Sequence, residues 1–171
     1  MTADLINAGL NYITYGLYLI TTSDGERNNG MIVNTAFQVT AEPAQIAISV
    51  NKASLTHELI LKSNKFAAMP LVQQTPMIFI GNFGFRTGRT FDKFAKVSFE
   101  KGLLGCPIVK ENTLSYMEAE VVQTLDVGTH TLFVGQVKNA GICCHDGDKP
   151  LTYEYYHAVI KGKTPKGATH L

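Results

Sequence analysis

GMIVNTAFQVTAEPAQIAISVNKASLTH, residues 30–57, is the stretch that decides the fold of this chain. Apolar and β-branched residues predict a strand over Met31–Val39, and the cluster Ala41-Glu42-Pro43 breaks it. Isoleucine and valine alternating with small residues predict a second strand over Gln45–Val50. Because only a short turn separates them, we expect these two strands to be neighbours in a sheet.

A short helix is predicted directly after this strand pair. Leu55, Leu59 and Lys62 have the spacing of one helix face, and Asn64 is a residue type that ends helices. The helix therefore begins in a polar loop.

The polar residues Lys52, Ser54 and Thr56 around the start of this helix have two interpretations. The first N–H groups of a helix lack internal partners and carry partial positive charge, so a phosphate binds well there. Ser54 and Thr56 would add hydroxyl donors, and Lys52 a full charge. The alternative is that Ser54 simply caps the helix, and spacing alone favours the cap.

Composition predicts one globular domain over residues 1–171, with 45% hydrophobic and 17% charged residues. The net charge of +1 and the scattered basic residues give no sign of a nucleic-acid partner. Without a basic, apolar leader or an apolar run of about 20 residues, we expect no membrane partner and a cytoplasmic location. Cys106, Cys143 and Cys144 fit a reducing compartment and lack metal-ligand spacing.

The chain before residue 30 predicts a hairpin. We expect a short helix near Asn7–Asn11 and a strand over Gly16–Thr22, followed by a turn through Ser23–Gly30. The Asp-Gly and Asn-Gly pairs in this turn tolerate left-handed backbone. The turn returns the chain into the strand that begins at Met31.

Two further elements are predicted after the central helix. Phe66–Leu71 is a strand candidate whose Pro70 belongs at a sheet edge or a bulge. Thr75 as cap and Pro76 in the first helical position predict a helix over Met77–Phe83, with an apolar stripe that suits core or dimer packing.

A basic loop follows over Phe85–Phe94 and leads into a predicted short helix. It carries Arg86, Arg89 and Lys93, which either hold a phosphate or form a solvated loop. Charge alone favours the solvated loop.

The second half of the chain predicts a long hairpin. Its strands are Leu114–Leu125, with Glu118 on the face opposite Ala119, and Thr131–Val137. His130 stands at the mouth of this hairpin, where a single histidine is usually a surface residue.

These elements favour an antiparallel barrel over a doubly wound sheet, because strands and helices do not alternate regularly. No G-x-G-x-x-G follows a predicted strand, so no dinucleotide-binding fold is indicated.

The run NNGMIVNTAFQVTAEPAQIAISVNKASLTHELI resembles the signature of the flavin reductase family, the FMN-binding split barrels, and within it the flavoredoxin-like branch. Further matches cover most of the chain in the family's order: YGLYLITTSDGERNNG, TGRTFDKF, DVGTHTLFVGQV and PLTYEYYHAVIKGKTPK. The resemblance implies a mainly β fold, an antiparallel split β-barrel of Greek-key type with a few short helices. It also implies FMN bound in a homodimer whose interface helps to form the pocket.

The resemblance further implies which residues hold the cofactor. The DKF element of the family implies that Lys93 binds the cofactor, and the SGR element implies the same for Arg89. The GDH element implies a place near the flavin for His130. Three residues separate Asp126 from His130 in this sequence, which leaves the role of Asp126 open. Tyr156 would help to close the flavin face, unless the aromatic run around it is core or interface packing at strand spacing. The full set of expected cofactor-binding residues is Asn29, Asn34, Thr35, Ala36, Ser49, Val50, Asn51, Lys52, Ser54, Thr56, Arg89, Lys93, His130 and Tyr156.

The function implied by the resemblance is an FMN-binding oxidoreductase, an NAD(P)H-dependent flavin reductase that passes hydride from nicotinamide to flavin N5. NADH or NADPH is the expected substrate, and no side chain is expected to be catalytic because the flavin carries the chemistry. The alternative is a flavoredoxin-like electron carrier that serves a separate redox protein such as a rubredoxin. Lys161, Lys163 and Lys166 would then dock that partner or form a solvated tail. A flavin-free binding module on the same fold is a third hypothesis.

Overall fold

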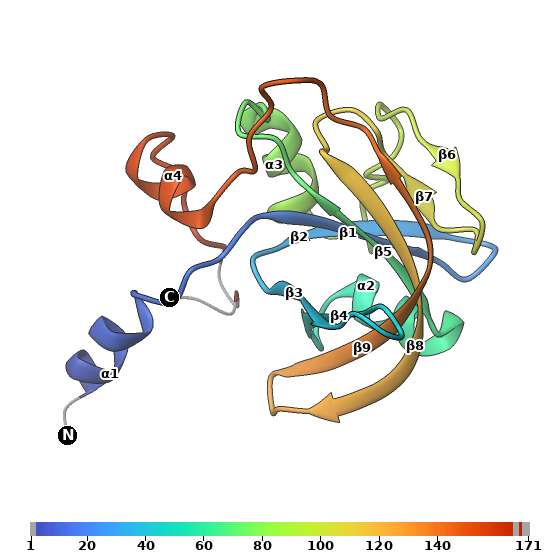
Figure 1. The fold of residues 1–171 in the computed structure, drawn as a ribbon, viewed down its shortest axis with the longest axis horizontal. Helices are drawn as coiled ribbons and strands as arrows, with labels where there is room; N and C mark the ends of the chain where they lie inside the picture. Colours follow the sequence, from blue (N-terminus) through green and yellow to red (C-terminus); the bar gives the residue numbers. More distant parts are fainter. Residues whose placement is uncertain (1–2, 166–167, 169–171) are drawn as a thin grey trace.

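The computed structural model describes residues 3–165 and 168. Its main feature is a seven-stranded sheet in the order β2-β1-β5-β8-β9-β4-β3 (Figure 1). The strands of this sheet are β1 (Tyr18–Ser23), β2 (Asn28–Val33), β3 (Ala36–Thr40), β4 (Gln45–Asn51), β5 (Lys65–Pro70), β8 (Ser115–Asp126) and β9 (His130–Ile142). Every neighbouring pair is antiparallel, so the predicted mainly β, antiparallel fold with a few short helices is confirmed.

The two edge strands of the sheet, β2 and β3, follow each other directly in the sequence. Asn34 and Thr35 connect them, and the Thr35 hydroxyl donates to Asn34 Oδ1 at 3.1 Å. The single strand predicted over Met31–Val39 is therefore wrong, because the chain leaves one edge of the sheet here and enters the other. The predicted pairing with the following strand is correct, since β3 pairs with β4.

The core lies on both faces of the sheet. Leu19 belongs to a cluster with Met69 and Phe83, whereas its neighbour Ile20 belongs to a second cluster with Phe133. Successive residues of a strand point to opposite faces, so β1 is covered on both sides. Each fully buried aliphatic or aromatic side chain contributes about 1.5–3 kcal/mol to folding.

The helices are short: α1 (Ala3–Leu10), α2 (Leu55–Ser63), α3 (Met77–Gly84) and α4 (Tyr153–Ala158). Helices α2 and α3 pack against the sheet, whereas α1 projects away from it (Figure 1). Helix α2 has the predicted ends: Ser54 Oγ accepts from the His57 N–H, and Asn64 closes the helix in the left-handed conformation at φ 54°. Within the described part of the chain, no helix is both long and apolar enough to cross a membrane.

Two expectations about proline positions were wrong. Strand β5 lies between β1 and β8 rather than at an edge, and the sheet accepts Pro70 because it is the last residue of the strand. Pro76, not Thr75, is the N-cap of α3, because the Thr75 hydroxyl donates back to the carbonyl of Val72.

Local side-chain contacts explain two other differences. The Phe85–Phe94 segment forms turns instead of the predicted short helix, since Thr87 Oγ1 and Asp92 Oδ1 accept backbone N–H groups two residues further on. The aromatic run at Tyr155–His157 is helical rather than extended, because Thr152 caps α4 by accepting from the Tyr155 N–H.

The 97–109 segment contains a small two-stranded sheet of β6 (Glu100–Lys101) and β7 (Pro107–Ile108). The buried carboxylate of Glu118 in β8 holds this segment. It accepts from the N–H groups of Leu103 and Leu104 at 2.7 and 3.1 Å. Strand β8 has a bulge between Glu118 and Ala119.

Candidate functional site

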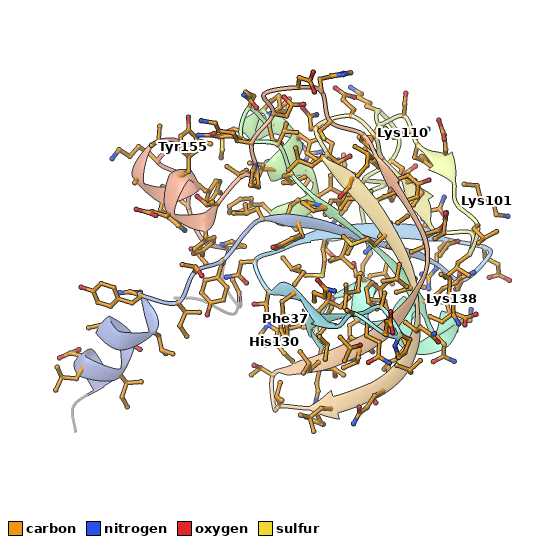
Figure 2. All side chains as sticks on the ribbon, viewed as in Figure 1. Phe37, Lys101, Lys110, His130, Lys138 and Tyr155 are labelled. Carbon is orange, nitrogen blue, oxygen red and sulfur yellow. The ribbon has the colours of Figure 1, made fainter. Side chains whose placement is uncertain are left out.

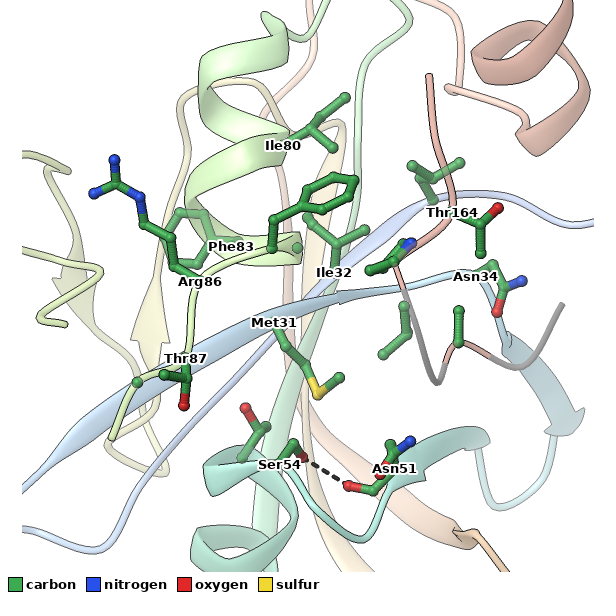
Figure 3. Close-up of a pocket in the computed structure, with 18 of the residues that line it drawn as sticks. Met31, Ile32, Asn34, Asn51, Ser54, Ile80, Phe83, Arg86, Thr87 and Thr164 are labelled. Carbon is green, nitrogen blue, oxygen red and sulfur yellow. Dashed lines mark hydrogen bonds between the residues drawn. The ribbon is translucent and has the colours of Figure 1, made fainter. Parts of the chain in front are cut away.

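A cavity of about 300 Å³ lies where β2, the start of α2, α3 and the C-terminal segment meet (Figure 3). Figure 3 shows Ser54 and Thr87 at one end of it and Asn34 and Thr164 at the other, with the Met31 side chain pointing into the middle. The cavity therefore has two polar ends and an apolar centre.

The first turn of α2 forms one polar end. The Ser54 hydroxyl donates to the carbonyl of Asn51 at 2.8 Å while it accepts from the His57 N–H, so its capping role is confirmed and its hydrogen is already used. The N–H groups of Leu55 and Thr56 precede the first intrahelical donors and face this end of the helix. An anion here would meet backbone donors rather than the Ser54 side chain.

Asn29 in β2 controls the direction of the neighbouring hydroxyl. Its Nδ2 donates to Thr56 Oγ1 at 2.8 Å, and both side chains are almost fully buried. A hydroxyl that already accepts can still donate its own hydrogen to another group. Thr56 can thus act as a donor to a ligand in the cavity.

Lys93 supplies positive charge to the cavity wall. Only 5% of the residue is exposed, and its ammonium donates to the carbonyls of Gly30 and Phe83 at 2.8 and 3.0 Å. The third hydrogen of the ammonium remains available for a further acceptor, and no carboxylate of the described residues forms an ion pair with Lys93. Burial lowers the pKa of Lys93 to about 8, since the charged form is poorly solvated.

The centre of the cavity is apolar. Met31 and Ile32 line it from β2, and Ile80 and Phe83 line it from α3. The apolar stripe of α3 therefore serves the core, as expected, and also forms one wall of the cavity. A flat, apolar ring system would fit between these side chains.

The opposite polar end contains an unsatisfied donor. Asn34 is 7% exposed, and its Nδ2 is a buried side-chain nitrogen with no hydrogen-bond partner among the described residues. Ser49, Asn51 and His130 also line the cavity. Burial lowers the pKa of His130, so its imidazole is neutral at pH 7.

The C-terminal segment covers the cavity from the side of α4. Tyr156 is buried and donates from its hydroxyl to the carbonyl of Lys163 at 3.0 Å, and Tyr153 and Thr164 hydroxyl oxygens lie 2.6 Å apart. Lys163 and Thr164 consequently belong to the lining. Lys166, the last of the expected docking lysines, lies outside the described residues.

The structure brings most of the predicted site residues around this one cavity. Those that line it are Asn29, Asn34, Ser49, Asn51, Ser54, Thr56, Lys93, His130 and Tyr156. Those that do not are Thr35, Ala36, Val50, Lys52 and Arg89.

The residues outside the lining have other contacts. Val50 is fully buried in the core, because its side chain points to the opposite face from Ser49 and Asn51. Lys52 pairs with Asp126 at 2.5 Å, and Arg89 pairs with Glu58 at 3.0 Å. These two cations, which the sequence suggested for a phosphate, are held by surface carboxylates.

Other lining residues were not predicted. Arg86 and Thr87 come from the basic loop, where the motif TGRTFDKF pointed to the neighbouring Arg89 and Lys93 instead. Thr164 and Tyr153 reach the cavity only because the C-terminal segment folds back over it, and no local pattern signals that contact.

Comparisons with known proteins agree with this geometry. A family model described as a flavin reductase-like domain matches residues 10–159. A ferric-chelate reductase (NAD(P)H) of Archaeoglobus fulgidus is 45% identical over 157 residues, which cover 92% of this chain and 92% of that protein. A high molecular weight rubredoxin of Moorella thermoacetica is 45% identical over 159 residues, which cover 93% of this chain and 69% of that protein.

Solved structures share the fold. An NADH:FAD oxidoreductase of Streptomyces globisporus superposes with a TM-score of 0.77 at 20% identity, covering 87% of this chain and 86% of the other. The flavin reductase PheA2 superposes with a TM-score of 0.72 at 27% identity, covering 89% and 93% of the two chains. A flavin reductase HpaC, solved with NADP+, has a TM-score of 0.74 at 23% identity and the same two coverages.

Proposed function

Because this chain belongs to the family of flavin reductase-like domains, we propose that it is an FMN-binding oxidoreductase that uses NAD(P)H to reduce flavin. The observation that carries the proposal is one cavity with the first backbone N–H groups of α2 at one end and an apolar slot beside them. A flavin mononucleotide has the matching parts, a phosphate and a planar ring system.

The residues present fit FMN. The unsatisfied Nδ2 of Asn34 provides a donor for an acceptor on the ring edge, where a buried donor without a partner costs about 1–3 kcal/mol. At the other end, the N–H groups of Leu55 and Thr56, the Thr56 hydroxyl and Lys93 would hold the phosphate. Ile80 and Phe83 would pack against the ring and exclude water from it.

FMN supplies the hydride-accepting and electron-passing chemistry that no amino-acid side chain provides. The chain itself binds the phosphate, orients the ring and sets the electrostatic environment. The nearly buried ammonium of Lys93 favours ligands with negative charge, since no carboxylate of the described residues neutralises it.

The visible spectrum of the purified protein tests the proposal. FMN is added, and NADH and then NADPH follow under anaerobic conditions. We expect two flavin bands that bleach quickly with at least one nucleotide. A protein that retains no yellow colour would contradict the proposal.

A second candidate function is an electron carrier that keeps FMN and exchanges electrons with a separate redox protein. The Moorella relative favours it, because that protein is named a rubredoxin and this chain spans 69% of it. Bands that persist with both nucleotides and bleach only with dithionite or a reduced protein partner would support the carrier.

We also propose that the protein is a cytoplasmic homodimer. Helix α1 exposes Leu5, Ile6 and Leu10, and an eight-residue helix is not stable in water without packing. Phe37 is exposed on edge strand β3 (Figure 2). A second copy would cover these apolar side chains, and light scattering on the purified protein tests this.

The three free cysteines agree with a reducing compartment, and thus with the proposed cytoplasmic location.

A further inference from the structure

The first turn of α2 is tied to three different strands by three side chains. Ser54 Oγ donates to the carbonyl of Asn51 in β4, and Thr56 Oγ1 accepts from Asn29 in β2. The third tie is His57, whose Nε2 lies 2.8 Å from Thr131 Oγ1 in β9. Ser54 and Thr56 line the cavity, whereas His57 does not.

His57 is packed between the helix and the sheet. The residue is 8% exposed, and its ring centre lies 5.5 Å from that of Phe133 in β9. Its backbone N–H donates to Ser54 Oγ, so the same residue completes the cap and anchors the turn. The contact to Thr131 spans 74 positions of the sequence.

From this arrangement we propose that His57 is a positioning residue for the phosphate end of the flavin site. It holds the first turn of α2 against β9, so that the N–H groups of Leu55 and Thr56 and the Thr56 hydroxyl converge on one anion. The inference rests on the proposed function, because it assigns the anion to the phosphate of FMN.

His57 acts through its shape and its hydrogen bond rather than through a charge. Burial lowers the pKa of His57, and the nearby Lys52 ammonium lowers it further, while the Asp126 carboxylate opposes this effect. The imidazole is therefore neutral at pH 7, and a neutral side chain that reaches Thr131 can replace part of its role. Glutamine places an amide near the position of Nε2, whereas leucine keeps apolar volume without a polar atom.

The experiment compares FMN with riboflavin, which has the same ring but no phosphate. Dissociation constants are measured by flavin fluorescence quenching for the full chain, for His57→Leu and for His57→Gln. We expect His57→Leu to weaken FMN binding about fivefold to tenfold and riboflavin binding by less than about twofold. His57→Gln should recover most of the FMN affinity.

Thr131→Val removes the same hydrogen bond from the side of β9, and it replaces His57→Leu in the test if that variant does not fold. It should show the same selective loss for FMN, and the double variant should lose no more than the single variants, since all remove one interaction. Equal losses for both flavins, or no loss, would overturn the positioning role. If the protein without substitutions binds neither FMN nor riboflavin, the proposed function itself fails. If it binds both but the variants keep its preference for FMN over riboflavin, only the positioning role of His57 fails.

Discussion

Asn29 donates its side-chain amide to the hydroxyl of Thr56 across 2.8 Å, between β2 and the first turn of α2. The pair joins two segments 27 positions apart and sits in the wall of the cavity. The backbone at Gly88 is pressed against the same amide, because a Cβ there would lie 2.0 Å from Asn29 Oδ1. Glycine at position 88 therefore lets the basic loop pack closely against the Asn29 side chain.

Replacing Thr56 by valine tests the hydroxyl. Thr56→Val should weaken FMN binding about tenfold and leave riboflavin binding nearly unchanged, because only the phosphate loses a donor. The free energy of unfolding should fall by about 1–3 kcal/mol, since Asn29 Nδ2 loses its buried acceptor. Fluorescence titrations and urea unfolding measure the two effects, and Thr56→Ser is the matched control that keeps the hydroxyl.

Lys93 should make the stability of the flavin-free protein depend on alkaline pH. Its pKa is about 8 in the folded protein against 10.5 in the reference state, so the unfolded chain binds more protons between these values. The free energy of unfolding should therefore rise as the pH increases from about 8 toward 10.5. Urea unfolding at several pH values measures this slope, which Lys93→Met should reduce. An identical slope in the variant would contradict the assignment.

FMN affinity should fall over the same pH range. The ammonium of Lys93 loses its proton above about pH 8 in the free protein, and the phosphate then loses a positive neighbour. Titrations of FMN between pH 7 and pH 10 check this, with riboflavin as the ligand that lacks the phosphate. A fall of equal size for Lys93→Met would assign the effect to another group.

Asn34→Leu should separate binding from stability. The variant removes a buried donor that has no partner, and it leaves the half-buried Thr35 hydroxyl to bond water instead of Asn34 Oδ1, so the melting temperature of the flavin-free protein should change little. Both FMN and riboflavin should bind about tenfold more weakly, because the ring edge loses its donor. Asn28→Leu is the control, since Asn28 is exposed at the start of the same strand β2 and does not line the cavity. An undiminished riboflavin affinity in Asn34→Leu would place the ring elsewhere.

Lys52→Ala and Arg89→Ala should change FMN affinity by less than about twofold, because surface carboxylates already hold both cations outside the cavity lining. The same fluorescence titration checks this at low and high salt. A large loss in either variant would mean that the side chain leaves its carboxylate and joins the phosphate site.

Local chemistry made much of the fold predictable. Helix α2 could be located with its cap at Ser54 and its end at Asn64, because both signals act within a few residues of the helix. The hairpins of β1 with β2 and of β8 with β9 followed from turn residues between alternating strands. The break at Asn34 and Thr35 was missed, since apolar residues continue on both sides of it.

The sequence by itself determined the strand-rich pattern, the capped helix and the family motifs, because each depends on neighbouring residues or on a conspicuous local run. Only the tertiary structure decided that Lys52 faces Asp126 and that His57 faces Thr131, two contacts that each span 74 positions. It also decided that Glu118 is buried under backbone donors. The physical reason is that partners so far apart meet only when the whole sheet has curled, and no short-range pattern specifies which side chains the curling brings together.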